Sequence, residues 1–180
     1  MTSILRRFPN FSAVIPVYAV ISFPIFSWTT VVWLWKLPYW VNFLTTSEIG
    51  AIFFYSMATA FLESVIVLGF LLLLSFILPA RIFRDQFMIR GTWIALGLTL
   101  SVLGHGVLLA IEGRNYFQDP LILWSLVSLP IIFFLTLAAT RVRFMTWMAE
   151  WLSDRLIVFL YILMPISILS MVAVFVRNIF

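Results

Sequence analysis

The chain has 180 residues, of which 64% are apolar and only 10% are charged, and its net charge is +4. Soluble domains carry about 25% charged residues. A chain this apolar has too little polar surface to cover itself in water, so the composition excludes a soluble globular domain and a disordered chain. The absence of cysteine also excludes a disulfide scaffold. We therefore expect an integral membrane protein.

Five segments are long and apolar enough to cross a hydrocarbon core of about 30 Å as helices, which requires about 20 residues each. These runs are too long and too continuously apolar for the strands of a membrane barrel. The sequence therefore predicts an all-α integral membrane protein with a single transmembrane domain over residues 1–180. We place its spans at about residues 11–35, 52–78, 92–111, 121–140 and 156–176.

The basic residues predict an orientation, because Lys and Arg are enriched in cytoplasmic loops. One side of the membrane would hold eight of them: Arg6, Arg7, Arg81, Arg84, Arg90, Arg141, Arg143 and Arg155. The other side would hold three: Lys36, Arg114 and Arg177. We therefore expect the N-terminus inside and the C-terminus outside.

The excess positive charge is interpreted as an orientation signal, so we expect no nucleic-acid partner. Basic side chains at a membrane surface attract anionic lipid head groups. The candidate head-group contacts are Arg81, Arg84, Arg90, Arg114, Arg141 and Arg143.

Two connecting segments mix apolar and polar residues. Residues 39–49 are a candidate for a short outer interfacial helix. In residues 141–155, apolar side chains recur every three or four positions and the charged ones fall largely elsewhere. This pattern predicts an inner interfacial amphipathic helix before the fifth span, with a partner-binding face as the alternative.

Small residues in two spans predict how helices pair, because they let backbones approach closely in lipid. Ser56, Ala60 and Ser64 recur every four residues in the second span. Gly97, Ser101 and Gly104 form a similar row in the third span. Since a short loop joins these two spans, we expect them to form an antiparallel hairpin through these faces.

Two ionisable residues, Glu63 and His105, lie well within spans. Glu63 would lie about 16 Å deep and His105 about 9 Å deep, both measured from the outer side by helix rise. A charged carboxylate there is costly, so the group is either neutral or meets a partner. We expect the two side chains to come within reach of a bridging water, with Ser101 and Glu112 continuing the polar line outward. This line is interpreted either as a structural contact between helices or as an acid–base relay or a substrate or ion site open to the outer face.

The sequence offers few residues for catalysis. One histidine and one carboxylate are too few for a catalytic zinc site, which normally takes three protein ligands. The absence of cysteine excludes iron–sulfur clusters held by this chain. We therefore assign no catalytic residue, metal or cofactor.

Three functional hypotheses remain. The first is a non-catalytic multi-pass subunit or scaffold of a larger membrane complex, packing against lipids and against other membrane subunits or further copies. The second is a small transporter or proton-conducting unit that uses Glu63 and His105. The third is a membrane-embedded lipid-modifying enzyme with an outer-leaflet site and Glu63 or Glu112 as base. We assume a bacterial cytoplasmic membrane. The direction in which Glu63 faces distinguishes these hypotheses. A side chain that faces lipid indicates a missing partner subunit, one that faces a wet cavity indicates transport or catalysis, and one buried against His105 indicates a structural contact.

Overall fold

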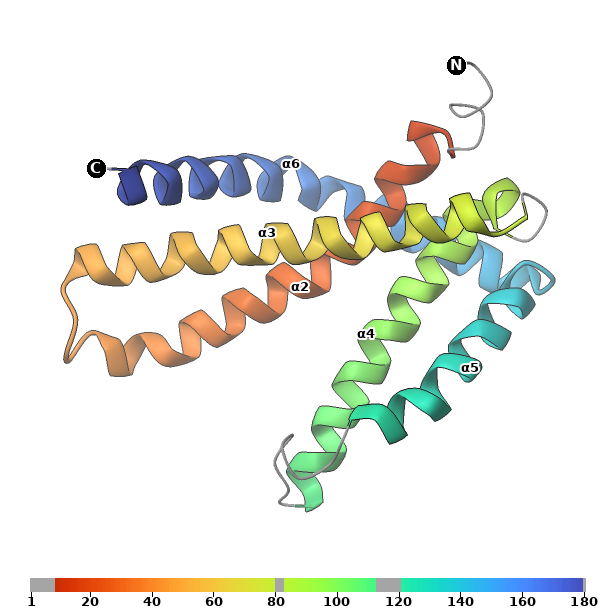
Figure 1. Ribbon diagram of the computed structural model, residues 1–180, viewed down its shortest axis with the longest axis horizontal. Coiled ribbons are helices and arrows are strands. Elements are labelled where there is room, and N and C mark those ends of the chain that lie inside the picture. Colours follow the sequence, from red (N-terminus) through yellow and green to blue (C-terminus); the bar gives the residue numbers. More distant parts are fainter. Residues whose placement is uncertain (1–8, 80–82, 113–120, 180) are drawn as a thin grey trace.

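The computed structural model describes residues 9–79, 83–112 and 121–179, all drawn in colour in Figure 1. Five long helices make up this part of the chain, and it contains no strand. All five are long and apolar enough to cross a membrane, which confirms the predicted helical class and number of spans. The helices are α2 (Phe11–Trp40), α3 (Thr46–Ile77), α4 (Phe87–Glu112), α5 (Leu121–Ala139) and α6 (Arg143–Ile179), with a short 3-10 helix η1 (Arg84–Gln86) before α4.

The connection between α2 and α3 is shorter than expected. Helix α2 continues through Pro38 to Trp40, and α3 begins at Thr46. The backbone N–H of Thr45 donates to the Glu48 carboxylate at 2.8 Å, and the N–H of Glu48 donates to the Thr45 hydroxyl at 3.4 Å. This reciprocal capping box satisfies two free backbone donors and starts the helix. A separate interfacial helix over residues 39–49 is therefore wrong.

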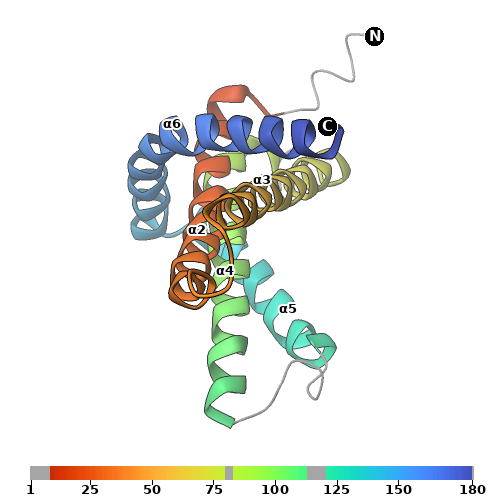
Figure 2. The same ribbon diagram turned by 90° about the vertical axis from the view of Figure 1, so that its left-hand side faces the viewer.

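The predicted inner amphipathic segment is helical, but it is continuous with the fifth span in the single helix α6. Figure 2 shows that α6 bends between its lighter first part and its dark-blue second part. Pro165 lies within this helix and cannot donate a backbone hydrogen bond, which is a physical reason for a bend. On the first part, the aromatic rings of Phe144, Trp147 and Trp151 are exposed.

Helices α2, α3 and α6 pack together, and Figure 1 shows α3 and α6 side by side. Ser64 of α3 is fully buried, and its hydroxyl lies 3.1 Å from the hydroxyl of Tyr18 of α2. Ala60 is buried beside Phe26 and Met57, with Leu163 and Ile166 of α6 packed against them. The small residues of α3 therefore face α2 and α6.

Helix α4 joins this bundle to α5. The hydroxyl of Thr92 lies 3.3 Å from that of Ser153 on α6. On α5, the side chain of Ile132 lies so close to Gly97 that a Cβ added to the glycine would be 2.9 Å from it. Helix α5 itself packs chiefly on α4.

The expected hairpin between the second and third spans through their small residues is therefore wrong. The face of Ala60 and Ser64 packs on α2 and α6, and the face of Gly97 and Gly104 packs on α5. The physical reason is that these helices are apolar on all sides. Small residues allow close approach, but they do not select which neighbour approaches.

Candidate functional site

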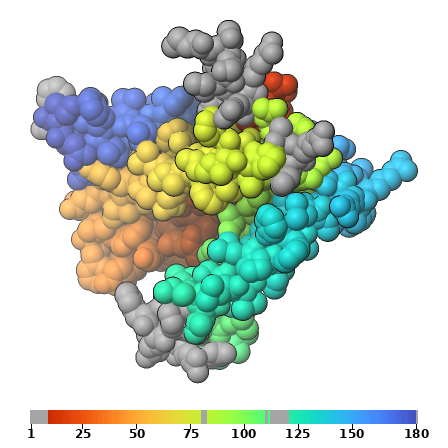
Figure 3. All heavy atoms as spheres, turned by 45° about the vertical axis from the view of Figure 1, so that its right-hand side comes forward, coloured from red at the N-terminus to blue at the C-terminus, as the bar shows by residue number. Residues whose placement is uncertain are grey.

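A groove of about 780 Å³ lies between α2, α3 and α4. Figure 3 shows the corresponding hollow in the surface below α3, between α2 and α5. Ile21 and Ala95 are buried in it, whereas Trp28, Val102 and Val107 are more than half exposed. Its walls are mainly apolar, and exposed apolar walls in a membrane protein face either lipid or another protein.

Glu63 is the one charged residue that lines this groove within the described part of the chain. It lies near the midpoint of α3, and its side chain is exposed. Across residues 9–79, 83–112 and 121–179, the structure shows no hydrogen bond or ion pair to its carboxyl group. An ionisable group in the middle of a membrane span is costly and normally meets a partner or water. The groove therefore presents an acidic group without a polar contact from the described chain.

A few of the other residues that line the groove are small or carry hydroxyl groups. Thr99 of α4 donates its hydroxyl to the carbonyl of Ala95 at 2.9 Å, so this group is already satisfied within the helix. Ser27 of α2 and Gly106 of α4 also line the groove. Because their side chains are short, such residues allow the backbone of a neighbouring helix to approach closely.

His105 belongs to a different contact, between α4 and α5. Its buried ring stacks on the indole of Trp124, with the ring centroids 5.2 Å apart. The Nε1–H of Trp124 donates to the hydroxyl of Ser101 at 2.8 Å and to its carbonyl at 3.1 Å. Gly104 also lies close to this indole. Ser101, Gly104 and His105 thus help to hold α5 against α4.

Among the described residues, Glu63 lines the groove whereas His105 stacks on Trp124, so the structure shows no direct contact between the two side chains, and the polar line that includes Glu112 stays a prediction. The α4 residues that line the groove are Ala95, Leu98, Thr99, Val102, Leu103, Gly106 and Val107, and His105 is not among them. The physical reason is that the rotation of α4 about its axis decides which neighbour each side chain meets, and His105 meets Trp124 of α5. Depth along the span was estimated from the sequence, but rotation about the helix axis was not.

The predicted head-group arginines differ in their surroundings. Arg90 is buried, and its guanidinium donates to the hydroxyl of Thr140 at 3.3 Å, so it links the start of α4 to the end of α5. The structure thus gives Arg90 a contact between helices, and its assignment as a head-group contact stays a prediction. Arg84 is partly buried, while Arg141 and Arg143 are exposed. Arg81, Arg114 and the side chain of Glu112 lie outside the described residues.

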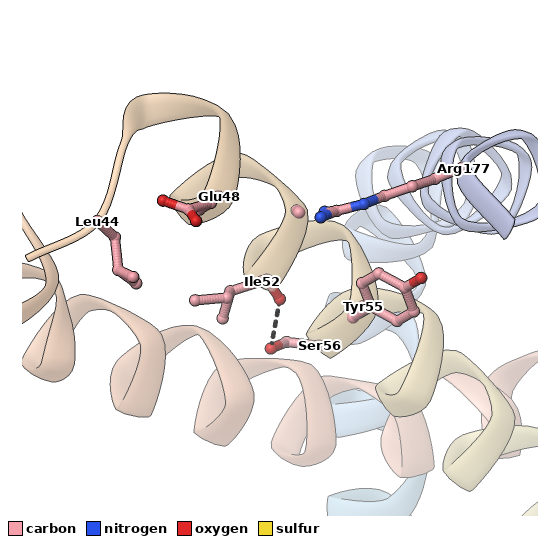
Figure 4. Close-up of a pocket in the computed structure, with 7 residues that line it drawn as sticks. Leu44, Glu48, Ile52, Tyr55, Ser56 and Arg177 are labelled. Carbon is pink, nitrogen blue, oxygen red and sulfur yellow. Dashed lines mark hydrogen bonds between the residues drawn. The ribbon is translucent and has the colours of Figure 1, made fainter. Parts of the chain in front are cut away.

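A second hollow, of about 450 Å³, lies where the start of α3 meets the end of α6. Figure 4 shows Arg177 extending from α6 toward Tyr55 of α3. The guanidinium carbon of Arg177 lies 5.9 Å from the centre of the Tyr55 ring, and the amide of Asn178 donates to the Tyr55 hydroxyl at 2.9 Å. Glu48, which also lines this hollow, is engaged in the capping box. These polar groups fasten two helix ends, and sequence reasoning missed them because contacts between distant segments leave no local pattern.

Small and polar residues of the second span have separate roles in the structure. Ser56 lines the second hollow and donates its hydroxyl to the carbonyl of Ile52 at 2.7 Å. Among the described residues, no group of three or more His, Cys, Asp or Glu side chains is arranged to hold a metal ion.

No known family model matches the chain, and no curated protein or solved structure with which it was compared does so either.

Proposed function

We propose that this protein is a non-catalytic multi-pass subunit of a larger membrane complex and that the groove between α2, α3 and α4 receives part of a partner protein. One observation carries the proposal: Glu63 is exposed on an apolar groove near the middle of a membrane-spanning helix. A group in this position is costly unless it meets a polar partner. Since the described chain supplies none, a second molecule completes the site.

The division of polar residues supports a binding role over a catalytic one. A catalytic site normally brings several polar groups to one place. Here Glu63 lies in the groove, whereas Ser101 and His105 are engaged with Trp124 in the contact between α4 and α5. This arrangement does not support the acid–base relay, which was one of the two interpretations of the polar line.

Photo-crosslinking in the native membrane tests the proposal with a matched pair of positions. Val102 is 62% exposed and lines the groove, and Val127 is 63% exposed on α5 and does not line it. A photoreactive amino acid at position 102 should give an adduct with one other protein, and the same residue at position 127 should not. Replacing Glu63 by Leu in the position-102 variant should reduce that adduct.

The mass of the assembly released in mild detergent provides an independent measurement. The chain has a mass of 20.8 kDa, and the proposal requires a complex that is heavier by at least one further protein subunit. A monomer that carries only lipid, together with lipid adducts from both crosslinking positions, would overturn the proposed function.

A further inference from the structure

We propose that the groove binds a transmembrane helix of a different protein, and that this helix carries a lysine or arginine near mid-membrane that pairs with Glu63. The inference rests on the proposed function and specifies the chemistry of the partner. Its basis is the combination of one exposed carboxyl group with apolar residues on all three surrounding helices and small residues on α2 and α4.

The charge of the groove selects the charge of its occupant. Glu63 is surrounded by aliphatic and aromatic walls that include Val67, Val102 and Trp28. In such surroundings a carboxylate is stabilised by an opposite charge that is desolvated with it, and ionisable groups within membranes characteristically pair with one another. A basic residue at the same depth in the partner meets this requirement.

Within the described helices, a second copy of this chain offers no basic residue near mid-span. The basic residues of the described helices lie toward their ends or in the first part of α6: Lys36, Arg84, Arg90, Arg143, Arg155 and Arg177. His105, the one histidine, is buried against Trp124. A second copy placed in the groove would therefore bring apolar residues or another Glu63 to the carboxyl group, so the partner is a different protein.

The shape of the groove fits a helix. The lining residues extend from Ile21 to Val31 on α2 and from Ala95 to Val107 on α4. At 1.5 Å per residue, these walls are roughly 15 to 18 Å long, which corresponds to about three turns of a helix. Ser27, Ala95 and Gly106 have short side chains, so the backbone of a helix in the groove could approach closely at these positions. A helix is also the form in which a single segment satisfies its own backbone inside lipid.

Synthetic transmembrane peptides test this inference with the full chain in phosphatidylcholine vesicles. The probes are helices of about 20 leucine and alanine residues whose central residue is Lys, Leu or Glu. Association is measured by energy transfer between a dye on the peptide and a dye on the protein. The Lys probe should bind about tenfold more tightly than the Leu probe, which corresponds to the upper range for polar contacts between membrane helices.

Three variants make the result specific to Glu63. Glu63→Gln should remove most of the preference for the Lys probe. Glu63→Lys should reverse the preference, so that the Glu probe binds more tightly than the Lys probe. Glu48→Gln is the control, because it removes an acidic charge outside the groove while glutamine still supports a capping box. It should leave the preference unchanged.

The outcomes separate this inference from the proposed function. Equal binding of the Lys and Leu probes, or a preference that survives in Glu63→Gln, overturns the inference, and the native mass of the complex still decides whether the protein is a subunit. A complex made only of copies of this chain overturns the inference as well. Absence of energy transfer with all three probes would show that the groove does not take up a helix and also overturns the inference.

Discussion

The bundle of α2, α3 and α6 differs from the pair of α4 and α5 in how its helices are held. In the bundle, each helix packs on the other two, and residues such as Ser64 and Ala60 are buried between them. In contrast, α5 packs chiefly on α4. Lipid removes the hydrophobic driving force between helices, so close packing and hydrogen bonds have to hold each contact. In the bundle, all three helices therefore contact one another. The groove lies beside this bundle, between α2, α3 and α4.

Two adjacent residues of α3 differ in the same way, because one is held between helices and the other is not. Ser64 is fully buried and bonded to Tyr18, whereas Glu63 is exposed in the groove. Contacts such as that of Ser64 hold the helices together, whereas Glu63 makes no such contact. Substitutions at internal contacts should therefore destabilise the isolated chain, and substitutions in the groove should not. Four measurements test this, in order of decreasing expected effect.

The largest effect is expected for Gly97→Val at the contact between α4 and α5. The new Cβ would lie 2.9 Å from the branched side chain of Ile132, so the helices have to move apart. Overpacking of this kind costs about 1–3 kcal/mol of unfolding free energy. Unfolding in mixed detergent measures it. Gly69→Val is the control, because nothing lies within 4 Å of a Cβ at that position. Equal losses for the two variants would show that α5 does not pack as described.

The next effect is expected for Trp124→Phe on α5. This change keeps an aromatic ring beside His105 but removes the N–H that donates to Ser101. We expect a loss of about 1 kcal/mol of unfolding free energy. Trp147→Phe is the control, since Trp147 is exposed on α6. Combining Trp124→Phe with Ser101→Ala should cost less than the sum of the two changes, and strict additivity would argue against the bond.

A smaller effect is expected in the bundle, for the bond between Tyr18 and Ser64. Contacts of this kind between membrane helices contribute about 0.6 kcal/mol on average. A double-mutant cycle with Tyr18→Phe and Ser64→Ala should therefore give a coupling energy near this value. Tyr161→Phe controls for loss of a hydroxyl at an exposed position. A coupling energy of zero would mean that these two hydroxyl groups do not interact.

The smallest effect on the isolated chain is expected for Glu63→Gln. Because the described residues make no polar contact with the carboxyl group, its replacement should change the unfolding free energy by less than about 0.5 kcal/mol. The same substitution should have a large effect on partner binding. A stability loss as large as that of Trp124→Phe would place Glu63 inside the fold and remove the basis for a binding groove.

Much of the fold could be predicted from the sequence, but the candidate site could not. Apolar runs predicted five helices, whereas the capping box of Thr45 and Glu48 that begins α3 was not predicted. The helix pairing was predicted incorrectly at Ala60 and Gly97, because each of these faces met a different neighbour. The sequence singled out Glu63 and His105 by their positions along the helices, but it did not show that Glu63 lines the groove and that His105 stacks on Trp124.

The sequence by itself determined what depends on length and hydropathy: the helical class, the five spans and the position of each polar residue along its span. The tertiary structure decided which side of each helix meets which neighbour, and so placed Glu63 in the groove and His105 against Trp124. The physical reason is the membrane environment. In water, an amphipathic helix turns its apolar face inward, but a helix that is apolar on all sides carries no such signal. Its rotation is fixed only when specific side chains meet.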